Sequence, residues 1–134
     1  MENLSIKKII LLVGVIMLTT MYFFSGINKI QNFSATASGL SKKPIFKMLP
    51  ELFSKLSLLG VIVLELLAPI LIILAIFNTD LKFLASLSAI GLGIFTLLAT
   101  LLYHFPPNGV EFYFFMKNIT IIGGFIVLAL FFDN

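Results

Sequence analysis

Four long apolar runs constrain the fold of this chain more than any other feature of its sequence. They cover residues 9–27, 51–77, 81–103 and 112–132. An α-helix rises about 1.5 Å per residue, so about 20 apolar residues span the hydrocarbon core of a bilayer. Only 11% of the residues are charged, against about 25% in soluble domains. The sequence therefore predicts an all-α integral membrane protein, a four-helix up-and-down bundle that forms a single transmembrane domain over residues 1–134.

The first apolar run, the connection that follows it and the absence of cysteine refine this prediction. The first run is longer than the apolar stretch of about 7–15 residues in a secretory signal peptide, so we expect it to be retained as a span. Residues 30–49 mix polar and apolar side chains, which predicts an interfacial segment with a short helix between the first two spans. The absence of cysteine excludes thiolate metal sites and disulfide exchange by this chain.

The charge of the chain indicates its surroundings. The net charge of +3 comes from lysines, and these flank the apolar runs for the most part. This balance suits anionic lipid headgroups and provides no basic stripe for nucleic acid. We expect the partners to be the lipid bilayer and other membrane protein subunits, in a bacterial plasma membrane or an organellar inner membrane. No His, Asp and Glu cluster has metal-ligand spacing, so no metal site is predicted.

Glu65 and Lys117 are charged residues within otherwise apolar stretches, residues 56–77 and 112–132. A lysine at the centre of a membrane helix costs about 2.5–3.5 kcal/mol, so such residues usually face the bundle interior and have a partner. We expect these two side chains to meet across the bundle. Two interpretations of the pair stay open, an internal structural staple and a functional acid with its base.

Up-and-down threading brings the polar residues of the spans towards one membrane side, which lies opposite the N-terminus and is called side B here. The first and third spans end on side B, and the second and fourth begin there. The residues in this half are Ser25, Asn28, Lys29, Glu65, Thr100, His104, Lys117 and Asn118. We predict a site with Glu65, Lys117 and His104 as catalytic candidates and with Ser25, Asn28, Lys29 and Asn118 as cofactor-binding candidates. The alternatives are a snorkelling anchor for Lys29 and a water-exposed residue at a helix end for His104.

Small residues indicate which helix faces turn inward. Ala85, Ala89 and Gly93 recur every four residues in the third span, a pattern that lets a neighbouring helix approach closely. In the first span, Gly14, Met21 and Ser25 recur at helical spacing, with Asn28 and Lys29 one turn beyond, and this stripe predicts the inward face. Simple packing is the alternative role for Gly14 and Met21.

The arrangement of these residues resembles that of DoxX-like membrane proteins. Residues 24–29 (Phe-Ser-Gly-Ile-Asn-Lys) are similar to the F-x-SG-x-x-K signature of that family. Glu65 and His104 resemble its acid and its histidine, and residues 115–124 (Phe-Met-Lys-Asn-Ile-Thr-Ile-Ile-Gly-Gly) are similar to its MKN…GG element. The resemblance implies a four-helix membrane protein linked to redox metabolism. One branch, the DoxD-like proteins, forms part of a thiosulfate:quinone oxidoreductase, and others associate with oxidative-stress enzymes.

Two functions follow from the residues taken together with this resemblance. The first is a small redox-associated membrane subunit, in which Glu65, Lys117 and His104 line a cavity that binds a quinone or relays protons. The alternative is a non-catalytic structural subunit of a larger membrane complex of respiratory type. A small transporter is a third interpretation, which requires oligomerisation because four spans leave little room for a lined path. The first hypothesis implies a quinone as the cofactor. The sequence does not decide whether the protein is an enzyme.

Overall fold

α-Helices and short 3-10 helices make up the computed structural model, which describes residues 5–133. In chain order they are α1 (Ile6–Gln31), α2 (Phe33–Ser41), η1 (Phe46–Met48), α3 (Glu51–Phe77), η2 (Thr79–Leu81), α4 (Lys82–Tyr103) and α5 (Val110–Asp133). The four long helices coincide with the four predicted spans and are long and apolar enough to cross a membrane. The all-α prediction is confirmed, and α2 is the short helix expected between the first two spans.

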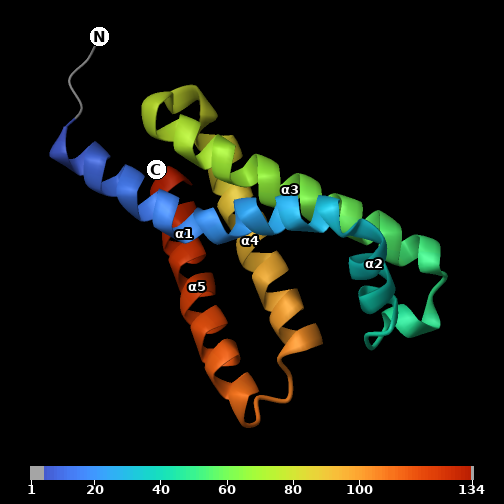
Figure 1. The fold of residues 1–134 in the computed structure, drawn as a ribbon. Helices are drawn as coiled ribbons and strands as arrows, with labels where there is room; N and C mark the ends of the chain where they lie inside the picture. Colours follow the sequence, from blue (N-terminus) through green and yellow to red (C-terminus); the bar gives the residue numbers. More distant parts are fainter. Residues whose placement is uncertain (1–4, 134) are drawn as a thin grey trace.

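The long helices form two antiparallel pairs that run obliquely across each other (Figure 1). One pair is α1 with α3, and the other is α4 with α5. The contact between α3 and α4 joins the pairs. At side B the ends of the two pairs diverge, and α2 lies next to the side B ends of α1 and α3 (Figure 1).

Small residues of α4 allow its neighbours to pack closely around it in the core. Ala85 and Ala89 are completely buried. A Cβ atom added to Gly93 would lie 3.4 Å from the Cβ atom of Phe125 in α5, so the two backbones approach closely at this level. Phe125 is itself fully buried, and its ring meets that of Tyr22 edge-on at 5.4 Å between centroids. The close approach predicted from the row of small residues is confirmed.

The inward face of α1 differs from the predicted stripe. Its buried residues are Val15, Thr19, Tyr22 and Gly26. The prediction is wrong for Gly14, which is exposed and would have no atom within 4 Å of an added Cβ. The two stripes differ by one position along the helix, and both have helical spacing. Periodicity alone therefore could not choose between them, and the packing of α1 on α3 decides.

Candidate functional site in the side B half

A cavity of about 320 Å³ lies between residues of α1, α3, α4 and α5 in the side B half of the bundle. We call it the charged pocket. Its lining residues are Met21, Tyr22, Ser25, Lys29, Glu65, Phe95, Thr96, Ala99, His104, Phe114, Lys117 and Asn118. Among the predicted site residues, Asn28 alone is missing from this lining. Residues from four different helices thus meet at one place, as the threading argument predicted.

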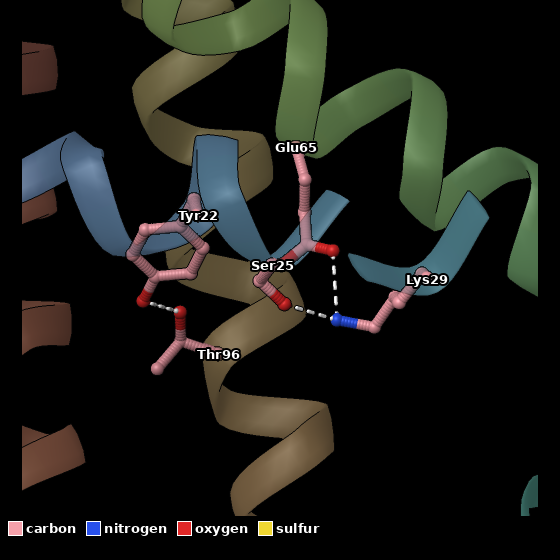
Figure 2. Close-up of polar contacts among 5 residues, drawn as sticks. All are labelled: Tyr22, Ser25, Lys29, Glu65 and Thr96. Atoms are coloured by element: carbon pink, nitrogen blue, oxygen red, sulfur yellow. Dashed lines mark hydrogen bonds and ion pairs between the residues drawn. The ribbon is translucent and has the colours of Figure 1, made fainter. Parts of the chain in front are cut away.

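An ion pair between α1 and α3 forms one wall of the charged pocket (Figure 2). The Nζ atom of Lys29 lies 2.8 Å from Oε1 of Glu65 and also donates to the hydroxyl of Ser25 at 2.5 Å. Only 2% of the Glu65 side chain is exposed, against 22% of the Lys29 side chain. The carboxylate is therefore held inside the bundle, while the ammonium group lies closer to its edge.

Gly26 allows α1 and α3 to approach at the level of this ion pair. A Cβ atom added to Gly26 would lie 2.9 Å from Cδ2 of Leu66 and 3.3 Å from Cβ of Glu65. A side chain at position 26 would therefore require the Leu66 side chain to move, and the tight contact with Cβ of Glu65 leaves little room between the two helices. The small residue thus sets the distance over which Lys29 reaches Glu65.

The expected pair of Glu65 with Lys117 does not form. The salt-bridge partner of Glu65 is Lys29, and Lys117 places its Nζ atom 5.0 Å from the ring centroid of Phe114. The reason is the helix arrangement, because α1 packs directly on α3 whereas α5 packs on α4. Glu65 and Lys117 nevertheless line the same cavity.

A chain of hydrogen bonds links α1, α4 and α5 beside the ion pair. The Thr96 hydroxyl donates to the Leu92 carbonyl at 2.7 Å, so in its 2.5 Å contact with Tyr22 it must accept the phenol proton. The Thr100 hydroxyl donates to the Thr96 carbonyl and accepts a proton from the Asn118 amide at 2.9 Å. These bonds fix the orientation of Tyr22 and Asn118 at the pocket wall (Figure 2 for Tyr22 and Thr96).

His104 follows the last residue of α4 and reaches both the pocket and the side B surface. Its Nδ1 atom lies 2.5 Å from Oε2 of Glu111 in the first turn of α5. Its ring stacks on that of Phe114 at 5.1 Å between centroids. The side chains of His104 and Glu111 are 27% and 40% exposed. The imidazole therefore connects a half-exposed carboxylate with the interior of the pocket.

Asn28 lies outside this site. It is exposed, and both its backbone carbonyl and its side-chain oxygen accept protons from the amide of Asn32. The prediction that Asn28 binds a cofactor together with Lys29 is not supported by this placement, since neighbouring residues of a helix point in different directions. In residues 5–133 no group of three His, Asp or Glu side chains is arranged to hold a metal ion.

The model of the DoxX family matches residues 10–105, which include α2, α3, α4 and most of α1. The chain belongs to the DoxX family. Neither a search of curated proteins nor a search of solved structures found a significant match. The four apolar helices and the family together establish an integral membrane protein.

The family match covers part of the charged pocket of this DoxX protein. It includes Ser25, Lys29, Glu65 and His104, whereas Lys117 of α5 lies beyond its end. The pocket as a whole offers ammonium, carboxylate, imidazole and amide groups beside aromatic rings. Such a set can donate hydrogen bonds to a carbonyl oxygen and can give or take protons.

The contact with Glu111 predicts which nitrogen of the neutral His104 ring carries the proton. A carboxylate only accepts, so the proton lies on Nδ1 and leaves Nε2 as an acceptor. Because His104 is the one histidine among the 134 residues, ¹⁵N spectra of histidine-labelled protein report on it without assignment. We expect the Nδ1–H form to dominate and to lose its excess in Glu111→Gln. Glu51→Gln, which changes an exposed acid of α3, serves as the control and should leave the spectrum unchanged. A dominant Nε2–H form in the unmodified protein would contradict the assignment.

Proposed function

We propose that this DoxX family protein binds the ring of a membrane-soluble quinone in the charged pocket. The observation that carries the proposal is the Lys29–Glu65 ion pair, which faces a cavity inside the membrane-spanning half instead of packed side chains. Ionisable residues within membrane spans are rare and mark ligand or proton pathways. A cavity that exposes such a pair to a ligand is therefore better explained by binding than by packing.

The dimensions of the pocket favour a single ring system. Ligand cavities usually enclose about 300–1,000 Å³, and the charged pocket, at about 320 Å³, is at the lower end of that range. A long isoprenoid tail has to leave the cavity sideways. Met21 of α1 and Phe114 of α5 line the pocket and are 49% and 39% exposed, so the cavity reaches the outer surface between these helices. A quinone, with a polar ring and an apolar tail, has this shape.

The chemistry of the lining also suits a quinone. Lys29 and Lys117 can donate to carbonyl oxygens, and the rings of Phe95 and Phe114 can contact the ring faces. Glu65 and His104 can exchange protons with those oxygens when a partner redox protein supplies the electrons. Because the sequence contains no cysteine, its own thiols cannot supply them. The protein would then act as a redox-associated subunit beside other membrane proteins.

Titration of the purified protein in nanodiscs with a short-chain ubiquinone analogue tests the proposal. We expect saturable binding that weakens at least about tenfold in Glu65→Gln, because the carboxylate orients the Lys29 ammonium group that donates to a quinone carbonyl, and such a charge-assisted hydrogen bond is worth roughly 1.5–3 kcal/mol. Glu51→Gln removes a carboxylate from the exposed start of the same helix and should bind as the unmodified protein does. Absence of saturable binding, or equal affinity in Glu65→Gln, would contradict the proposal. Intact folding without quinone binding would favour the structural-subunit alternative.

A further inference from the structure

The charges that line the charged pocket do not balance. Two lysines and one glutamate contribute to its lining. Lys29 and Glu65 neutralise each other. The neutral His104 ring adds no charge, and the Glu111 carboxylate to which it is hydrogen-bonded lies outside the lining. Lys117 is therefore a cation without a counter-charge in the cavity.

The surroundings of Lys117 do not supply that counter-charge. Within residues 5–133, no carboxylate forms a salt bridge with its ammonium group. Its recorded contact is the ring of Phe114, at 5.0 Å from Nζ to the centroid. A ring face attracts a cation but carries no net charge, so the positive charge is not neutralised. Lys117 is an exposed residue that also contributes to the lining, so its ammonium group lies at the open side of the cavity. An anionic ligand that reaches it there gains a charge-assisted hydrogen bond.

We propose that the charged pocket selects a ring ligand with one negative charge, carried by an acidic hydroxyl next to a carbonyl, and that Lys117 binds this oxygen. This inference rests on the proposed function and narrows its ligand from quinones in general to deprotonated hydroxyquinones. Lys29 remains paired with Glu65, so the site has one cation available for one anionic oxygen. The formal charge of the lining falls to zero when such a ligand is bound.

A snorkelling lysine is the competing explanation for the position of Lys117. Phe114 lies three residues nearer the side B end of α5, so the contact with its ring turns Lys117 towards the interface. A lysine that only snorkels contributes to the surface charge and does not distinguish between ligands inside the cavity. The selectivity of the pocket between matched ligands therefore separates the two roles.

Two naphthoquinones that differ in one substituent provide the test. One carries a hydroxyl and a methyl group on the quinone ring and is an anion at neutral pH, and the other carries two methyl groups and is neutral. Titrations use the full-length protein in nanodiscs of neutral lipid, so that anionic headgroups do not compete for Lys117. We expect the anion to bind roughly 10- to 100-fold more tightly than the neutral compound, the range of one charge-assisted hydrogen bond.

Three variants assign this preference to Lys117. Lys117→Met should bind both naphthoquinones with similar affinity, whereas Lys117→Arg should keep the preference for the anion. Lys47→Met removes the same charge from an exposed site on side B outside the pocket and should keep it as well. Binding of the neutral compound with no preference for the anion would overturn this inference and leave the proposed function standing. Binding of neither compound would overturn both, and a preference that survives in Lys117→Met would overturn the role of Lys117.

Discussion

Replacing Lys29 with methionine will destabilise the protein more than any other single charge removal in the bundle. The substitution leaves the Glu65 carboxylate, whose side chain is 2% exposed, without its partner. Removal of one member of a buried ion pair typically costs about 3–5 kcal/mol. Glu65→Gln should cost less, about 1–2 kcal/mol, because the amide oxygen still accepts from Lys29 and the lysine is partly exposed. Thermal or denaturant unfolding in detergent measures both values.

A double variant separates the ion pair from other effects of these substitutions. Lys29→Met combined with Glu65→Leu replaces both charges by apolar side chains, which is often close to neutral in buried pairs. Its free energy of unfolding should return to within about 1 kcal/mol of the unmodified protein. Additive losses in the double variant would contradict a direct interaction between the two residues. Restored stability together with lost quinone binding would assign the pair to the site and not only to the scaffold.

Replacing Gly26 with valine will force α1 away from α3. Cδ2 of Leu66 and Cβ of Glu65 lie 2.9 and 3.3 Å from the place of a Cβ. The Leu66 side chain can turn away from a single Cβ, but the two further carbon atoms of valine leave no room beside Cβ of Glu65 unless the helices move. Overpacking of this kind costs typically about 1–3 kcal/mol. The shift also lengthens the path from Lys29 to Glu65, so we expect the quinone affinity to fall together with the melting temperature.

Gly14 provides a matched control on the same helix. A Cβ atom there would have no neighbour within 4 Å, and the position is exposed. Gly14→Val should therefore change stability by no more than about 0.5 kcal/mol, as is usual for surface positions. Equal losses in Gly14→Val and Gly26→Val would show that helix propensity, and not the close approach of α1 and α3, explains the effect.

The fold could be predicted because it depends on the lengths and the order of the apolar runs, and both can be read along the sequence. The apolar runs set the lengths of α1, α3, α4 and α5, and successive spans of a chain that crosses a membrane run in opposite directions. The threading then placed the polar residues in one half of the bundle without any knowledge of packing. For this reason Ser25, Lys29, Glu65, His104, Lys117 and Asn118 could all be predicted to lie near one another.

The contacts inside the site could not be predicted in the same way. Whether Glu65 meets Lys29 or Lys117 depends on which helix packs on α3, and both pairings satisfy the need for a partner. The pairing of Glu111 with His104 has no clear signal in the sequence, because a polar residue at a helix start has an ordinary explanation as a surface group.

Tyr22 is the clearest omission from the predicted site. Its hydrogen bond to Thr96 and its place in the lining make it part of the pocket. A signal was present, since Tyr22, Gly26 and Lys29 follow one another at four and three residues and therefore share a helix face. The predicted stripe through Gly14 lies one position along α1 from the helix face that contains Tyr22.

Photolabelling with an azido-quinone tests most directly the central claim that the charged pocket is a ligand site. The reagent is applied to the protein in nanodiscs, and the labelled peptides are identified by mass spectrometry with and without an excess of unlabelled quinone. The account predicts label within residues 21–29, 95–104 and 114–118, the segments that line the pocket, and its loss under competition. Label that persists under competition, or that lies on exposed residues outside the lining such as Phe83 and Val127, would contradict it.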